Sequence, residues 1–317
     1  MVIKYSITML SNQSYKATNG YLNNDNAIVG HTRACTMFFS DAHLHSNPVI
    51  GLGAGRISAK FRKEGGWFIA LVALPPHYYG IKEINIESYR RVLEILNREA
   101  KAAVENGVKV VRLMGFHPAE VDGYYKQGIK GRRLYELGEK VLNLIEDALK
   151  NGLLDGIGEV GRQHYGTSVE RVVVSETIMI KALEIARNYD AVVHLHLEQG
   201  GWITAYSIRK LMDLTGFKHG KIILHHSAID TAVSAEELGL GYTIPIKSFN
   251  KEAVSLKLSN AMIESDFIDD PGRPGVASYP WEIPRVIRNY LEDNLVDEEY
   301  VYRVMVDNIS KYYGVSP

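Results

Sequence analysis

Short apolar runs alternate with helical segments along most of the chain. Eight of these runs are rich in β-branched or aromatic side chains and many are bounded by Gly or Pro, which is typical of buried parallel strands. They cover residues 37–45, 67–74, 108–116, 153–161, 190–198, 221–227, 240–246 and 260–267.

The segments between these runs carry the helical period. Residues 88–106, 134–150 and 301–312 each place their apolar side chains on one face, as an amphipathic helix requires. Eight strands alternating with helices predict an α/β fold, namely a (β/α)8 TIM barrel, over residues 37–317.

The first 36 residues have a different composition. They are rich in Asn, Ser and Gly and show no sustained period, so we expect an N-terminal extension over 1–36 and a barrel domain over 37–317. An internal start at Met37 is an alternative in which the extension is dispensable.

Composition narrows the class of protein. The 317 residues are 46% hydrophobic and 23% charged, with a formal net charge of -1, which argues against a globally basic surface that wraps nucleic acid. The single cysteine, Cys35, permits no internal disulfide. The sequence shows neither a secretory leader nor an apolar stretch long enough to span a membrane, so we expect a cytoplasmic protein without membrane partners.

In a barrel, reactive groups lie where the strands end, so the ends of the predicted strands hold the candidate site residues. His43 and His45 end the first run and point to the same face, which makes half of a metal site. Asp41 shares their parity one layer deeper and is expected to orient a ligand. Glu159 ends the fourth run among glycines, where a buried carboxylate needs a positive partner.

The fifth and sixth runs each offer two histidines. His194 and His196 share a face, and His196 is preferred as ligand because it is nearer the strand end, with His194 buried below it as a partner. His225 and His226 face opposite ways, and parity cannot choose between them without the register; His226 is slightly favoured. One of His194 and His196 is expected to be a satisfied core histidine, and at most one of His225 and His226 should point inward.

Asp266 follows the eighth run and is placed to bind metal and accept a proton from water. The alternative for Asp266 is a capping role in the turn-rich segment that follows it. Taken together, these residues fit two divalent ions about 3.5–4 Å apart with a bridging carboxylate. Zn, Mn or Mg would serve, and the many imidazoles favour Zn or a transition metal.

The order of these residues resembles that of the amidohydrolase superfamily of metal-dependent barrel hydrolases. Within it, the segments DAHLH, GFHPAE, GEVG and ESDFIDD are similar to those of TatD-type hydrolases, often described as metal-dependent deoxyribonucleases, and ESDFIDDPGRPG is similar to a TatD-related subgroup found among archaeal proteins. The resemblance covers nearly everything from Met37 onward. It implies Glu159 as the bridging carboxylate and the following metal ligands: His43, His45, Glu159, His196, His226 and Asp266.

The sequence also departs from the TatD pattern. No Arg follows the fifth-strand histidines closely, and GEVG is followed by Arg162-Gln163-His164 instead of Leu-Asp-Tyr. Arg162 is therefore either a substrate contact or a salt-bridged loop residue.

Two further sets of residues are candidates for substrate binding. His117, in the family's Gly-x-His-Pro position, is predicted to contact substrate or phosphate, with a plain loop histidine as the alternative. Lys130, Arg132 and Arg133 lie near Tyr124 and Tyr125 and would suit a phosphate backbone, although a solvated loop is the more ordinary reading.

The sequence thus predicts a binuclear metal-dependent hydrolase in which Glu159 and Asp266 are catalytic. A phosphoester, as in 3'-5' exonucleolytic cleavage of DNA, is the first expectation for its substrate. The alternatives are a small-molecule amide, lactone or ester hydrolase, and a barrel that binds a metal or phosphorylated ligand without turnover.

Overall fold

The computed structural model describes residues 37–217, 220–273 and 277–317. The predicted extension over residues 1–36, which includes Cys35, lies outside the described residues, so its role stays a prediction. The strands are β1 (Phe39–Leu44), β2 (Gly66–Val72), β3 (Lys109–Met114), β4 (Gly156–Gly161), β5 (Val192–His196), β6 (Ile222–Leu224), β7 (Gly241–Pro245) and β8 (Ala261–Glu264).

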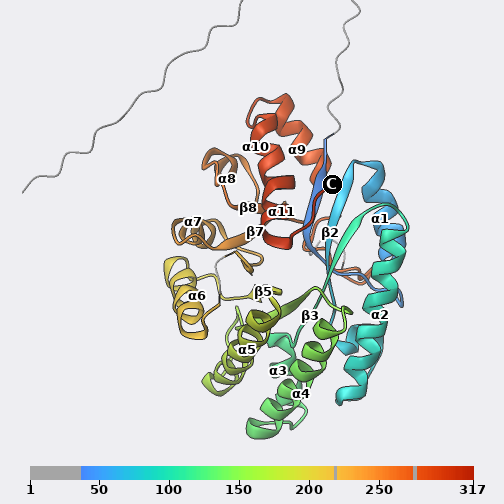
Figure 1. The fold of residues 1–317 in the computed structure, drawn as a ribbon, viewed down its shortest axis with the longest axis vertical. Helices are drawn as coiled ribbons and strands as arrows, with labels where there is room; N and C mark the ends of the chain where they lie inside the picture. The colour runs from blue at the N-terminus through green and yellow to red at the C-terminus, as the bar shows by residue number, and fades with distance from the viewer. Residues whose placement is uncertain (1–36, 218–219, 274–276) are drawn as a thin grey trace, which may run out of the picture. The chain divides into compact units, whose positions relative to one another are not determined.

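All eight strands are parallel and are hydrogen-bonded in chain order from β1 to β8. The sheet closes at the seam between β8 and β1, where Leu44 pairs with Phe267 and the Asp266 amide donates to the His43 carbonyl at 3.1 Å. The predicted (β/α)8 barrel is therefore confirmed (Figure 1).

Helices cover the outside of the strands. They are α1 (Ala54–Lys63), α2 (Ile86–Val104), α3 (Pro118–Lys126), α4 (Gly131–Lys150), α5 (Val169–Tyr189), α6 (Trp202–Thr215), α7 (Ile229–Glu237), α8 (Lys251–Ser255), α9 (Glu282–Glu292), α10 (Glu298–Tyr302) and α11 (Asn308–Tyr313), with a 3-10 turn η1 (Pro76–Tyr79) and a π-helical turn η2 (Arg303–Asp307). Within the described residues, no helix is both long and apolar enough to cross a membrane.

The last helical segment, from α10 through η2 to α11, anchors the start of the barrel. The Trp67 indole donates to the Met305 carbonyl at 3.0 Å, and the Ser40 hydroxyl contacts the Met305 sulfur at 3.6 Å. Ser40 and Trp67 lie early in β1 and β2, so this segment packs near the amino ends of the first two strands. The candidate polar residues lie at the opposite ends of the strands, so the functional site is expected there.

Candidate metal centre

Glu159, in β4, is a buried carboxylate with imidazoles on both sides. Its Oε1 lies 3.5 Å from His43 Nε2 and 3.3 Å from His45 Nε2. Its Oε2 lies near three further rings: His117 Nε2 at 3.3 Å, His196 Nδ1 at 2.9 Å and His225 Nε2 at 2.9 Å. Burial alone would raise the pKa of Glu159, but these imidazoles, His117 and His225 first, hold it well below its usual value.

Glycines let the neighbouring strands approach Glu159 closely. A Cβ on Gly115 would collide with the Glu159 backbone, and one on Gly161 would collide with the His196 carbonyl. Gly161 also has a φ of 148°, in the range that favours glycine. The glycines of the GEVG segment therefore allow β4 to place its carboxylate next to the histidines of β5.

The two oxygens of Glu159 divide the centre into two halves. We name His43, His45 and Asp266 the β1 half-site, and His196 and His225 the β5–β6 half-site. Three overlapping groups have ligand atoms within 4.8 Å of one another, as a metal ion requires: His43 with His45 and Asp266, His43 with Glu159 and His225, and His117 with Glu159 and His196. The shared carboxylate suits two neighbouring cations.

Hydrogen bonds behind the rings of His45 and His225 orient their Nε2 atoms toward the centre. His45 Nδ1 lies 3.0 Å from the Val72 carbonyl, which only accepts, so Nδ1 carries the proton and Nε2 is bare. His225 Nδ1 likewise faces Glu264 Oε2 at 3.4 Å. Burial lowers the pKa of His45 to about 4, whereas Glu159 and Glu264 overcome burial and raise the pKa of His225 well above its usual value.

The donor set fits divalent cations on physical grounds. Among the described residues, His196 Nε2 and Glu264 Oε1 are buried polar atoms without a hydrogen-bond partner. Buried imidazole lone pairs converging on a carboxylate are costly unless a cation compensates them. Mixed imidazole and carboxylate ligands suit Zn or another transition metal.

The structure separates His225 from His226. His225 is buried and contacts Glu159, whereas the side chain of His226 is 45% exposed and pairs with Asp266 Oδ2 at 2.8 Å. β6 ends at Leu224, and His226 has a φ of 57°, which turns its side chain away from the β6 direction. His225 therefore lies in a group that could hold a metal ion, whereas His226, which the sequence slightly favoured, is a partner of Asp266. The choice of ligand between them stays a prediction.

Asp266 and His196 belong to the groups whose ligand atoms converge at the centre. Burial opposes ionisation of Asp266, but the hydrogen bond with His226 and the nearby imidazoles lower its pKa below the usual value. Burial lowers the pKa of His196 to about 3. Both groups are therefore in their metal-binding protonation states at neutral pH.

Asp41 and His194 lie deeper in the barrel. Asp41 Oδ1 accepts from the Ser265 amide at 2.9 Å and from the His43 amide at 3.3 Å, so it ties β1 to the chain after β8. Burial raises the pKa of Asp41 to about 7. His194 Nδ1 lies 2.8 Å from His43 Nδ1, and burial lowers the pKa of His194 well below its usual value.

Arg162 is largely buried and is held by partly exposed carboxylates. Its guanidinium donates to both oxygens of Glu198 at 2.7 and 2.8 Å, to Glu176 at 3.0 Å and to Ser207 at 2.9 Å. These partners occupy the guanidinium group, as in the salt-bridged alternative for Arg162, and its role in binding substrate stays a prediction.

His117 lies at the edge of the centre and begins α3. Its Nδ1 accepts from the Ala119 amide at 2.9 Å, which leaves the ring proton on Nε2 when the ring is neutral. A protonated Nε2 donates a hydrogen bond, so His117 is better suited to an anionic group than to a metal ion.

The basic segment after β3 is solvent-exposed. Lys130 lies over the Tyr125 ring at 4.7 Å, Arg132 pairs with Glu136 at 2.7 Å, and Arg133 is exposed. The structure does not bring these three residues into contact with the imidazoles, and their substrate role stays a prediction.

Three residues at the centre were not proposed from the sequence. Glu264 stands behind His225, Tyr313 hydrogen-bonds His194 at 2.7 Å, and the His164 ring lies 4.6 Å from the His196 ring. Glu264 shares strand parity with Asp266, which was a usable signal. Tyr313 lies in the last helix, and no motif around it in the sequence predicts its contact with His194.

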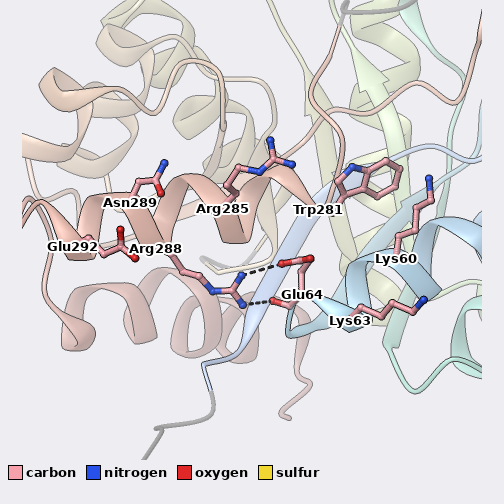
Figure 2. Close-up of a pocket in the computed structure, with 8 residues that line it drawn as sticks. All are labelled: Lys60, Lys63, Glu64, Trp281, Arg285, Arg288, Asn289 and Glu292. Atoms are coloured by element: carbon pink, nitrogen blue, oxygen red, sulfur yellow. Dashed lines mark hydrogen bonds and ion pairs between the residues drawn. The ribbon is translucent and has the colours of Figure 1, made fainter.

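A cleft of about 430 Å³ between α1 and α9 contains none of these histidines. Figure 2 shows Arg288 of α9 reaching Glu64, which it contacts at 2.9 Å, while Lys60 lies 4.5 Å from the Trp281 ring centre. This cleft is a charged groove on the helical layer and does not contribute to the candidate centre.

A barrel that gathers imidazoles around a buried carboxylate where its strands end has the architecture of a metal-dependent hydrolase. Residues 40–314 match the family described as TatD related DNase. The chain belongs to this family.

Two archaeal proteins are similar to this chain. An uncharacterized protein of Methanocaldococcus jannaschii is 28% identical over 280 residues, which cover 87% of this chain and 95% of that protein. A TatD-like protein from Archaeoglobus fulgidus has a similar fold, with a TM-score of 0.60, 20% identity and coverage of 87% of this chain and 100% of that chain.

Two further solved structures share the fold. A TatD homologue from Escherichia coli K12 has a TM-score of 0.60 at 18% identity, covering 87% of this chain and 98% of that chain. The organophosphorus hydrolase from Deinococcus radiodurans has a TM-score of 0.57 at 11% identity, with coverage of 87% and 92%.

Proposed function

We propose that this protein is a binuclear metal-dependent hydrolase that cleaves phosphoesters. The observation that carries the proposal is Glu159, whose two oxygens face different sets of imidazoles. One ion would be held by the β1 half-site and the other by the β5–β6 half-site, with Glu159 between them. Two such ions, when bound, supply activation of a water molecule and polarisation of the scissile bond.

The protein's own residues handle the proton. The lowered pKa of Asp266 keeps this carboxylate ionised, so it can accept a proton from the attacking water and hand it to the leaving group. His226 bonds Asp266 at 2.8 Å and is partly open to solvent, so it holds the Asp266 side chain in place at the mouth of the site.

Several groups around the strand ends suit a phosphoester substrate, including a nucleic acid. His117 Nε2 offers a hydrogen bond to a phosphoryl oxygen beside Glu159. Tyr165, Trp202 and Tyr279 are 43%, 53% and 41% exposed in the segments that follow β4, β5 and β8, where they can stack on bases. Lys130 and Arg133 add positive charge on the chain that follows β3.

A small-molecule ester, lactone or amide hydrolase is the second candidate. It is favoured by the net charge of -1 and by the pairing of Arg132 with Glu136, which weaken the case for a strong nucleic-acid surface. The same ligand set supports either reaction, so the substrate must be found by experiment.

The test combines metal content with turnover. Protein purified without added metal should contain, or take up, about two equivalents of Zn or Mn by inductively coupled plasma mass spectrometry. It should then cleave a phosphodiester such as bis(p-nitrophenyl) phosphate and a 3'-labelled single-stranded oligonucleotide. A lactone, a carboxylic ester and an amide are assayed in parallel.

The outcomes separate the candidates. Turnover of lactones alone would replace the phosphoester proposal with the second candidate. Metal uptake without any turnover would favour a ligand-binding barrel. Failure to take up metal would overturn the hydrolase proposal itself.

A further inference from the structure

We infer that Tyr313 and His194 are positioning residues that hold the His43 ring proton on Nδ1, so that His43 presents a bare Nε2 to the metal centre. The inference rests on the proposed metal centre and extends it to the last helix, 119 residues along the chain from His194.

The Tyr313 hydroxyl has two partners. It lies 3.0 Å from the Ala42 carbonyl and 2.7 Å from His194 Nε2. A carbonyl oxygen only accepts, so the single hydroxyl proton is donated to Ala42. Toward His194 the hydroxyl can then only accept, which requires the proton of the His194 ring to be on Nε2.

That proton placement determines the next contact. His194 is completely buried, and a neutral ring with its proton on Nε2 has a lone pair on Nδ1. His43 Nδ1 lies 2.8 Å from this atom. One of the two nitrogens must donate, and only His43 has a proton to give, so His43 is protonated on Nδ1.

The consequence appears on the other side of the His43 ring. Its Nε2 lies 3.5 Å from Glu159 Oε1 and 3.3 Å from His45 Nε2, which is itself bare because His45 Nδ1 donates to Val72. Two unprotonated nitrogens and a carboxylate oxygen therefore converge. His45 is oriented by the backbone of β2, whereas His43 depends on side chains from β5 and α11.

The chain supplies a matched control for the hydroxyl. Tyr312 is buried in α11 next to Tyr313, but its hydroxyl has no hydrogen-bond partner among the described residues. Tyr313→Phe and Tyr312→Phe each remove a phenol hydroxyl from neighbouring positions of α11. Only Tyr313→Phe removes the hydroxyl that holds the His43 proton on Nδ1.

The experiment measures the affinity of each variant for Zn by competition with a chromophoric chelator, and the thermal unfolding of the metal-free proteins. Tyr313→Phe should weaken binding of one of the two equivalents by about 10–100-fold, while Tyr312→Phe should bind as the parent does. His194→Gln, whose amide can still accept from His43 and donate to Tyr313, should retain more affinity than His194→Leu. Equal affinity of Tyr313→Phe and the parent would overturn the inference.

A second readout needs no metal. Imidazole ¹⁵N shifts of the metal-free parent should show His43 protonated at Nδ1, and Tyr313→Phe should lose that signature. If the parent binds no metal, the proposed function fails while these shifts still decide the proton position. A parent protonated at His43 Nε2 would overturn the inference alone.

Discussion

The two halves of the centre hold their histidines by different means. In the β1 half-site, the ring of His45 is fixed by a neutral partner, the Val72 carbonyl, and its pKa is lowered to about 4. In the β5–β6 half-site, His225 lies between two carboxylates, with Nε2 2.9 Å from Glu159 and Nδ1 3.4 Å from Glu264. His45 is therefore oriented by a neutral dipole and His225 by charged groups.

This difference bears on how each half accepts a cation. Neutral imidazoles that are already deprotonated offer their lone pairs without a preceding proton loss. His225 lies between two carboxylates, and its proton compensates their negative charge. A bound cation would compensate the same negative charge, so it would compete with that proton. His45 in the β1 half-site can bind a cation without losing a proton, whereas His225 in the β5–β6 half-site would lose its proton when a cation binds.

The largest effect should come from removing the charge that both halves share. Glu159→Gln is expected to abolish uptake of both equivalents and to lower turnover on the order of 10³-fold or more, since each oxygen faces a different half. Metal content and phosphodiester hydrolysis check this. Glu198→Gln, which alters a carboxylate held by Arg162 instead, should keep its metal. Retention of one tightly bound equivalent in Glu159→Gln would show that the halves are independent.

A smaller and one-sided effect is expected from Glu264→Gln. Loss of the negative charge behind His225 should weaken only one equivalent, by about 10–100-fold, because the β1 half-site does not contact Glu264. Stepwise metal titration would resolve the two affinities. Glu237→Gln, on an exposed position of α7, is the control. Equal weakening of both equivalents would contradict the division into halves.

The smallest effect on the centre should come from the loop that follows Glu159. Asp122 accepts hydrogen bonds from Gln163 at 2.8 Å, and from Thr167 and Arg171 at 2.5 Å each. Burial alone would raise the pKa of Asp122, but these hydrogen bonds lower it. Asp122→Asn should cost about 1–3 kcal/mol of unfolding free energy at pH 7 and leave both metal affinities unchanged.

The pH dependence of that cost has a definite sign. A lowered folded-state pKa stabilises the protein above the unfolded value of about 3.9, and the contribution disappears as the pH falls through the folded pKa. The stability gap between parent and Asp122→Asn should therefore be full at pH 7 and shrink below about pH 4. Glu87→Gln, in an exposed pair with Arg90, should show almost no gap at either pH. A gap that persists in acid would point to packing instead of charge.

Much of the fold could be predicted from the sequence because local signals are strong in a parallel barrel. Buried strands read as apolar runs, and the helix predicted over 134–150 matches α4 at Gly131–Lys150. Strand parity was enough to pair His43 with His45, and glycines around Glu159 marked a carboxylate at a strand end.

The remaining parts of the site depend on contacts between distant segments. Parity could not choose between His225 and His226, because the choice follows from where β6 ends and from the positive φ of His226. The sequence left two roles open for Arg162, because its ion pair with Glu198 joins residues 36 positions apart. Tyr313 reaches His194 only through the packing of the last helix, which no local pattern encodes.

The seam of the barrel bears on when the protein becomes competent during synthesis. His43 and His45 leave the ribosome early, but the Asp266 amide that bonds the His43 carbonyl and the Phe267 carbonyl that receives the His45 amide arrive more than two hundred residues later. An amino-terminal fragment would hold two histidines with no closed sheet around them, and such long-range pairing is slow to form. The β1 half-site would therefore be complete only after β8 has paired with β1. An ion bound there would indicate a closed barrel.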